Sequence, residues 1–262
     1  MTHYSLQNIE TLSAPFSRYH DLKSFALDFD DFENADHLSD FRTLCSGISS
    51  KDVLDVGCGI GHTSLLLSYW GNNVTVVEPA LECCEVVELN SKRFGINVNI
   101  YQTRSEEIKA IPGEFDIVLF HASLHHADQP EESLKQCFDK VSGGGRILLI
   151  SESILKCFRT KAWYSMMLEN HPEKVGHYGG NEHVFFSHEY ANMLRKAGFV
   201  SIELIPSVIY RRATRGLGKL TWSKRIFRIA VDGLITIGFF HFLNWMSLVQ
   251  VTYVGTKPNS RL

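Results

Sequence analysis

Short apolar runs alternate with segments of helical periodicity through the middle of the chain. The runs do not alternate with polar residues, which is typical of strands buried on both faces of a sheet. Repetition of strand, helix and strand at this spacing predicts a mainly parallel sheet. We expect strands over 53–57, 74–78, 98–102, 115–120 and 146–152, and helices over 62–70, 80–94 and 130–140.

The pattern changes after residue 152. A helix is predicted over 187–199, with Ser187 as its N-cap and Gly198 as its stop signal. Strands over 200–210 and 247–256 flank a basic and then apolar segment and form an antiparallel hairpin at the end of the sheet. The predicted fold is therefore α/β and Rossmann-like, a seven-stranded, mostly parallel sheet with helices on both faces and a C-terminal antiparallel hairpin.

The length of 262 residues fits one domain with three additions to this framework. The additions are an N-terminal helical cap over 1–51, an insertion over 156–186 and a helical insertion over 211–245. A net charge of −3 argues against a general polyanion binder. Six cysteines without a C-x-x-C pair, and an N-terminus without a secretory pattern, predict a cytoplasmic protein with reduced thiols.

The sharpest motif is D-V-G-C-G-I-G over 55–61, between a predicted strand and a predicted helix. Glycines let the backbone turn tightly beside a ligand, and a helix N-terminus favours an anion. Glu78 ends the next predicted strand, where a carboxylate can accept both hydroxyls of a ribose. These features predict a nucleoside-containing cofactor. His62 replaces the third glycine of a dinucleotide motif and no phosphate lysine follows, which argues against NAD and ATP.

Three segments together resemble the class I S-adenosylmethionine-dependent methyltransferases: VLDVGCGIG over 53–61, Glu78 after VTVV, and FDIVLFHASLHHADQPEESL over 115–134. The last is similar to the small-molecule group that includes the ubiquinone/menaquinone C-methyltransferases. The resemblance implies methyl transfer with S-adenosyl-L-methionine as cofactor and S-adenosyl-L-homocysteine as product. It also implies a cofactor site formed by Asp55, Gly57, Cys58, Gly59, Gly61, Glu78, Pro79 and His121.

The adenine contact departs from the family pattern. Thr103-Arg104-Ser105 stands where the family often has Gly-Asp-Ala, whose aspartate meets the adenine amino group. The resemblance therefore leaves this contact to Ser105 or to Glu106. The alternative is that Glu106 and its neighbour only begin a short surface turn.

Histidines are the candidate catalytic residues, because a hydroxyl acceptor needs a base to take its proton. His126, and after it His125, follows the strand over 115–120, at the end of an open α/β sheet where ligands bind. The alternative is that the pair caps the next helix or packs on the adenosine. His183 is a third candidate in the acceptor-side insertion, where 176–188 is predicted as a lid or a solvated loop.

We predict no metal. The spacing of His177, Glu182 and His183 could suggest ligation, but no H-E-x-x-H or C-x-x-C pattern supports it. His121 instead of a carboxylate after the strand over 115–120 argues against a metal-assisted catechol-type enzyme. The sequence HASL over 121–124 lacks the Asn/Asp-Pro-Pro turn of amino-methylating enzymes for DNA bases and protein amides.

The insertion over 211–245 begins with seven bases and no acid over 211–228. The apolar run over 229–243 is too short to span a bilayer and is interrupted by Asp232 and His241. The insertion could pack on the sheet edge, cover the acceptor, form a dimer surface or lie on the inner, anionic face of a membrane. Nucleic acid is not an expected partner, because no recognisable module is present.

The predicted function is O-methylation of a small-molecule or lipid-linked acceptor with a histidine as general base. Two alternatives remain. The segment LHHADQP over 124–130 suggests C-methylation of a quinone-like ring. A non-catalytic regulatory protein that binds S-adenosylmethionine would share the same cofactor motif. The chain is expected to act as a monomer or a homodimer.

Overall fold

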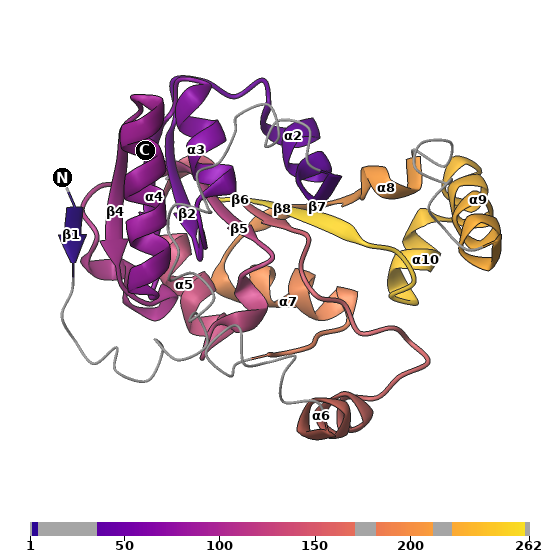
Figure 1. Ribbon diagram of the computed structural model, residues 1–262. Coiled ribbons are helices and arrows are strands. Elements are labelled where there is room, and N and C mark those ends of the chain that lie inside the picture. The colour runs from indigo at the N-terminus through magenta and orange to yellow at the C-terminus, as the bar shows by residue number, and fades with distance from the viewer. Residues whose placement is uncertain (1, 5–35, 171–181, 212–221, 260–262) are drawn as a thin grey trace.

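The computed structural model describes residues 2–4, 36–170, 182–211 and 222–259. Its centre is a mixed sheet with the strand order β1-β4-β3-β2-β5-β6-β8-β7 (Figure 1). Neighbours from β1 to β6 are parallel, and β8 is antiparallel to both β6 and β7. The strands are β1 (Thr2–Tyr4), β2 (Asp52–Val56), β3 (Asn73–Val77), β4 (Val98–Gln102), β5 (Phe115–His121), β6 (Val141–Ile150), β7 (Val200–Pro206) and β8 (Val251–Thr256).

The predicted fold class and all seven predicted strands are confirmed, and an eighth strand, β1, is added at the edge of the sheet. This strand lies in the segment predicted as a helical cap, so that part of the prediction was wrong. Three residues carry too little periodicity to be recognised, whereas the open edge of β4 offers them backbone partners. The described helical part of the cap is η3 (Asp36–Leu38) and α2 (Ser39–Cys45), and residues 5–35 lie outside the description.

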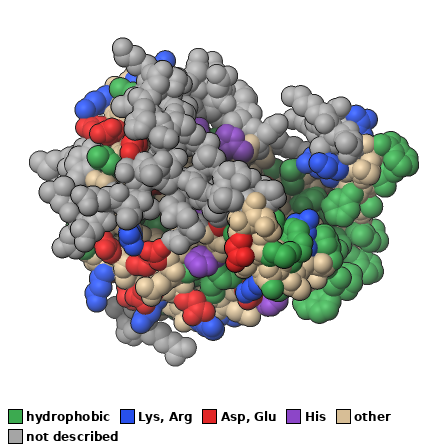
Figure 2. All heavy atoms as spheres, turned by 60° about the horizontal axis from the view of Figure 1, so that its bottom comes forward, with side chains coloured by type: hydrophobic (Ala, Val, Ile, Leu, Met, Phe, Trp, Pro, Cys, Tyr) green, Lys and Arg blue, Asp and Glu red, His purple; other side chains and the backbone are tan. Residues whose placement is uncertain are grey.

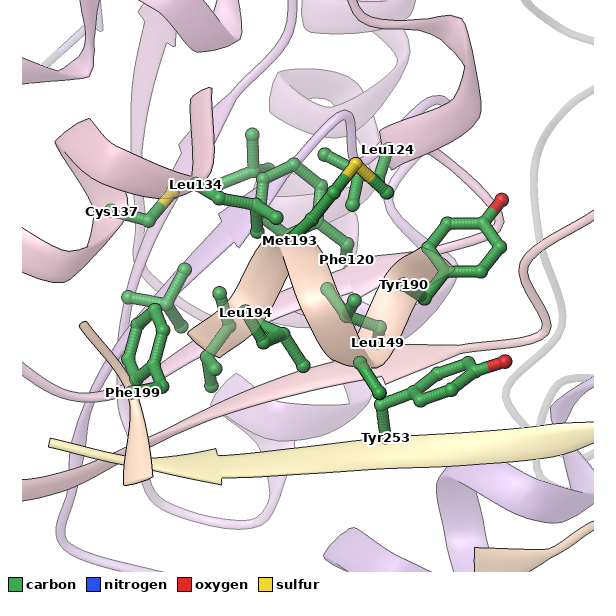
Figure 3. Close-up of a cluster of buried hydrophobic side chains, with 14 of the residues drawn as sticks. Phe120, Leu124, Leu134, Cys137, Leu149, Tyr190, Met193, Leu194, Phe199 and Tyr253 are labelled. Atoms are coloured by element: carbon green, nitrogen blue, oxygen red, sulfur yellow. The ribbon is translucent and has the colours of Figure 1, made fainter. Parts of the chain in front are cut away.

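Helices cover both faces of the sheet because its strands are apolar on both sides. One face packs on α2, α3 (His62–Tyr69) and α4 (Leu81–Phe94), and the other on α5 (Pro130–Lys140) and α7 (Ser187–Ala197). Figure 3 shows α7 placing Tyr190, Met193 and Leu194 over Phe120 and Leu149 of the sheet. Parallel strands packed in this way bring their carboxyl ends to one edge.

Two local predictions near α7 and β7 were wrong. Ser187 is the first helical residue and not the N-cap, which is Phe186. The Ser187 hydroxyl instead lies 2.7 Å from the Tyr253 hydroxyl and donates to Asn244. The strand predicted over 200–210 ends at Pro206, and α8 (Val208–Arg211) follows, its first N–H donating to Asp40 Oδ1 over 2.6 Å.

The insertions carry the remaining helices. They are α6 (Lys161–Asn170), α9 (Trp222–Thr236) and α10 (Phe240–Trp245), which project from the sheet in Figure 1. Within the described ranges, each helix is too short or too polar to cross a membrane. Short 3-10 turns, η4 (Ser105–Ala110) and η5 (Leu124–His126), follow β4 and β5. These two turns lie at the carboxyl edge where the candidate site forms.

Candidate active site

The glycine loop joins β2 to α3 in a conformation that favours glycine at three positions. Gly57, Gly59 and Gly61 have φ angles of 70°, 54° and 86°, in the left-handed region. A Cβ at Gly57 would lie 2.6 Å from Ser123 Cβ, and one at Gly61 would lie 2.8 Å from Val87 Cγ2. A Cβ at Gly59 would meet no atom within 4 Å. The loop is therefore tightly packed at both ends and open in the middle, where a ligand can approach the backbone.

We expect Gly61→Ala to lower the free energy of unfolding more than Gly113→Ala. Both glycines have φ near 87°, but a Cβ at Gly113 would meet no atom within 4 Å. The left-handed conformation costs each alanine ~1–2 kcal/mol, and the contact with Val87 adds ~1–3 kcal/mol at Gly61. Urea unfolding of both variants measures the difference. Equal losses would show that α4 moves aside without cost.

Asp55 of β2 supports the glycine loop through hydrogen bonds to α3. Its Oδ2 accepts hydrogen bonds of 2.6 Å from the hydroxyls of Thr63 and Ser64 in α3. Burial raises the pKa of Asp55 to about 6, although these two hydrogen bonds lower it. Asp55 thus ties β2 to α3 across the loop, and its Oδ1 is buried without a hydrogen-bond partner among the described residues.

Glu78 follows β3 and lies against the same loop. Its Oε2 accepts the Gly59 N–H over 2.8 Å, and its Oε1 accepts the Ala80 N–H over 3.0 Å. A carboxylate has about four lone-pair sites, so two remain for a pair of hydroxyls. Burial raises the pKa of Glu78 to about 7, opposed by the two N–H donors. The structure brings Glu78 and the glycine loop together, as the ribose prediction requires.

The other predicted cofactor residues surround this pair or lie beside it. Cys58 is half-buried within the loop, and the Pro79 carbonyl accepts Gln102 Nε2 of β4 over 3.3 Å. Ser105 Oγ lies 2.8 Å from Ser133 Oγ, and Glu106 Oε1 accepts the Gln129 N–H over 2.9 Å. The polar atoms of Ser105 and Glu106 therefore hold η4 against the start of α5. Their role toward adenine remains a prediction.

His121 ends β5, next to β2 at the point where the strand order reverses. Open α/β sheets bind ligands at this switch point. Burial lowers the pKa of His121, and the charge of His37 lowers it further. Burial, and after it the nearby His37 and His121, lower the pKa of His62 to about 4. This edge thus presents neutral imidazoles, which suit a cationic ligand, and His121 Nε2 is buried without a hydrogen-bond partner in the described part of the chain.

Glu152, which sequence reasoning missed, locks the turn after β5. It accepts the N–H groups of Ser123, Leu124 and His125 over 3.1–3.2 Å, and His125 Nδ1 lies 2.6 Å from its Oε2. Burial raises the pKa of Glu152, but His125 and the N–H donors lower it more. Burial likewise lowers the pKa of His125, but Glu152 raises it more. The two form a buried ion pair, so His125 holds the turn in place.

We expect Glu152→Ala to lower the free energy of unfolding by ~3–5 kcal/mol, because it leaves a buried imidazolium without its partner. The matched control is Glu131→Ala, which breaks an exposed ion pair with Lys196 and should cost ~0–1 kcal/mol. Urea unfolding measures both. Similar losses in the two variants would contradict the assignment of a buried pair.

The same pair predicts how stability depends on pH. Because the pKa of Glu152 is lowered in the folded state, its ionisation stabilises the fold at pH values above the range in which an ordinary carboxyl group titrates. This stabilisation is lost as the pH falls through the pKa of Glu152 in the folded state. Because the pKa of His125 is raised in the folded state, its protonation stabilises the fold at pH values below the range in which an ordinary imidazole titrates. This stabilisation is lost as the pH rises through the pKa of His125 in the folded state. The pair therefore stabilises the fold most between these two limits.

His126 differs from His125 in its partner and its exposure. His126 Nδ1 lies 3.2 Å from Glu182 Oε2, and Glu182 Oε1 accepts the Tyr164 hydroxyl over 3.1 Å. Burial raises the pKa of Glu182, and it raises the pKa of Tyr164 to about 12. Glu182 comes from the segment before α7 and Tyr164 from α6, so the predicted acceptor-side insertion does reach the turn after β5. Tyr164 was not predicted, because nothing in its local sequence marks it.

The backbone of His183 is hydrogen-bonded to the turn that carries His125. Its N–H donates to the His125 carbonyl over 2.8 Å, and its Nε2 is buried without a hydrogen-bond partner among the described residues. Its ring lies 5.9 Å from that of Phe185. His177, the other histidine of the proposed spacing, lies outside the described residues.

Three of these side chains could also hold a metal ion. Ligand atoms of His125, His126 and Glu182 lie within 4.8 Å of one another. His125 Nδ1 is held by Glu152, an arrangement that often supports metal-bound histidines. The absence of a metal therefore remains a prediction, and these three residues are where it is tested.

The sheet order, the switch point between β2 and β5 and the turn of three left-handed glycines define a doubly wound, Rossmann-like α/β domain. A family model described as a methyltransferase domain matches residues 32–204. This match covers more than half of the chain, which therefore belongs to this family of methyltransferase domains. The resemblance found in the sequence is confirmed at this level.

A relative from Pseudomonas aeruginosa, a ubiquinone biosynthesis O-methyltransferase, is 31% identical over 105 residues, which is 40% of this chain and 45% of the relative. The chain thus spans about half the length of the curated relatives that it matches. A solved structure of phosphoethanolamine N-methyltransferase 2 from Haemonchus contortus, in complex with S-adenosyl-L-methionine, has a TM-score of 0.55 at 15% identity and covers 85% of this chain and 52% of that one.

The cyclase SpnF has a TM-score of 0.56 at 14% identity, covering 87% of this chain and 82% of that one. At such identities the likeness shows a shared fold. Because a cyclase and a methyltransferase share it, the reaction has to be argued from the site.

Proposed function

We propose that the protein transfers a methyl group from S-adenosyl-L-methionine to a hydroxyl group of a small-molecule or lipid-linked acceptor. The observation that carries this proposal is the contact between Glu78 and Gly59 N–H at the ends of β2 and β3. It joins a carboxylate suited to ribose hydroxyls to a backbone loop with open space at its centre. Membership of the methyltransferase-domain family supports the same cofactor.

The glycine loop and the residues beside it have different roles in binding the cofactor. Asp55 fixes the loop, Gly59 lets the ligand approach, and Glu78 accepts the ribose hydroxyls. His121 lies at the end of β5, and burial favours its neutral form, which adds no positive charge of its own beside a cationic sulfonium. When bound, S-adenosylmethionine supplies an electrophilic methyl carbon.

His126 acts on the acceptor as general base. Its Nδ1 lies 3.2 Å from Glu182 Oε2, and this carboxylate stabilises the charge that the ring gains with the acceptor's proton. Tyr164 holds Glu182 from the other side. His125 is already engaged with Glu152, so we assign it a positioning role. The similarity to a ubiquinone biosynthesis O-methyltransferase favours an oxygen acceptor over the carbon of a quinone-like ring.

The test is formation of S-adenosylhomocysteine from S-adenosylmethionine with hydroxylated aromatic acceptors, with and without an apolar chain. We expect turnover with at least one acceptor and an O-methyl product by mass spectrometry and NMR. A C-methyl product would favour the quinone-ring alternative. Calorimetric binding of the cofactor without turnover would favour a regulatory protein, and no binding of either cofactor form would overturn the proposal.

Chelation distinguishes the base from a metal at the same residues. We expect EDTA to leave turnover unchanged, because His126 takes the acceptor's proton without a metal ion. Loss of activity that a divalent cation restores would instead make His125, His126 and Glu182 metal ligands.

A further inference from the structure

Helices α9 and α10 expose a concentrated apolar surface. Of sixteen large apolar side chains exposed in the described chain, nine lie between residues 222 and 245. Figure 2 shows hydrophobic side chains gathered at this end of the molecule. We call them the α9–α10 apolar face, and they are Trp222, Ile226, Phe227, Ile229, Leu234, Ile237, Phe239, Phe242 and Trp245.

The orientation of α9 is the reverse of that of an ordinary surface helix, which buries its apolar side. Trp222, Ile226 and Ile229 follow the spacing that places side chains on one side of a helix, and all three are exposed, Trp222 to 78%. Val231 and Ile235 lie on the opposite side and pack against the core. The helix is therefore anchored by a narrow stripe, and its wider apolar side faces outward.

Positive charge accompanies this surface. Lys224, Arg225 and Arg228 lie in the first two turns of α9, and Asp232 is the one acid of that helix. In the sequence, these are the last three of the seven bases over 211–228. A helix with bases on one side and Trp, Phe and Ile on the other is typical of helices that lie in the interface of an anionic membrane.

We propose that the α9–α10 apolar face docks on a membrane surface that contains anionic lipids. A second copy of the chain fits the face less well, because an isologous contact would bring two basic segments together. The proposal rests on the exposed side chains and the charge of α9, and it stands whether or not the methyl-transfer proposal holds.

Docking would bring the bilayer close to the acceptor side of the site. Asn244 at the end of α10 accepts the Ser187 hydroxyl, and Ser247 Oγ accepts the Ser187 N–H over 3.0 Å. Ser187 begins α7 directly after the segment that carries Glu182. Helix α10 is thus hydrogen-bonded to the start of α7, next to the segment that carries Glu182, a geometry suited to an acceptor with an apolar chain.

The test is sedimentation of the full chain with vesicles of phosphatidylcholine alone and of equal parts phosphatidylcholine and phosphatidylglycerol. We expect the chain to bind the anionic vesicles with an affinity that salt lowers. Its affinity for vesicles of phosphatidylcholine alone should be about 100-fold lower. Phe227→Gln with Phe242→Gln should lower binding about tenfold or more per side chain. Lys224→Gln with Arg228→Gln should lower it about fivefold per charge, on anionic vesicles only.

Phe158→Gln, which changes an exposed phenylalanine outside the face, is the matched control and should bind as the wild type does. All variants alter exposed or half-exposed side chains, and unchanged melting curves verify that they fold. Equal sedimentation of the wild type and the double phenylalanine variant would overturn the proposal. The proposal would also be overturned if the wild type bound neither kind of vesicle and formed a dimer, while the double phenylalanine variant was a monomer. Binding of S-adenosylhomocysteine, measured in parallel, reports on the proposed function separately.

Discussion

His126→Ala is expected to lower the turnover number for methyl transfer by about 10²–10⁴-fold, the usual contribution of a positioned general base. The dissociation constant for S-adenosylhomocysteine should stay unchanged, because the proposal assigns His126 to the acceptor and Glu78 to the cofactor. Turnover measured with saturating cofactor, and calorimetry with S-adenosylhomocysteine, separate the two effects.

His188→Gln is the matched control, since His188 is exposed on α7 and stacks on Phe186. Glu182→Gln should also lower turnover, by less than His126→Ala, because an amide still orients the ring but cannot stabilise its charge. Wild-type turnover in His126→Ala would remove His126 from the mechanism and leave His183 as the remaining histidine candidate.

Glu78→Ala is expected to weaken binding of S-adenosylhomocysteine by about 10–100-fold. Hydrogen bonds to a charged group contribute ~1.5–3 kcal/mol, and each 1.4 kcal/mol is tenfold in affinity. The substitution also removes the acceptor for the Gly59 N–H, so the loop loses support at its open centre. Calorimetry measures the affinity, and Glu82→Ala in the first turn of α4 is a control outside the loop.

The pH dependence of binding gives an independent check on Glu78. Because burial raises its pKa to about 7, the carboxylate forms as pH rises through that value. Affinity for S-adenosylhomocysteine should therefore increase from pH 6 to pH 8. Glu78→Gln should bind weakly with no such dependence. A wild-type affinity that is flat over this range would show that Glu78 does not hold the ribose as a carboxylate.

The two adjacent histidines illustrate what a sequence leaves open. His125 and His126 have the same chemistry and differ by one position after β5. The structure places His125 against Glu152, which is buried at the end of β6, and His126 against Glu182, which arrives from the acceptor-side insertion. Glu152 and Glu182 are 27 and 56 residues away, and no local pattern pairs them with either histidine.

Ser187 failed as a predicted N-cap for the same reason. Local spacing favours it, but Tyr253 and Asn244 approach from far along the chain and take its hydroxyl. In contrast, the helix predicted over 130–140 does begin at Pro130, because a fixed φ and a missing N–H act within one residue.

Local sequence was enough to predict the βαβ order, the mostly parallel sheet, the terminal hairpin and the glycine loop with its acid. Each depends on periodicity or on backbone preferences that act over a few residues. The folded chain was needed to show which histidine pairs with which carboxylate, where β1 attaches and which side of α9 faces outward. Those outcomes depend on contacts between distant segments, where burial and charge select one partner among several that the local sequence allows.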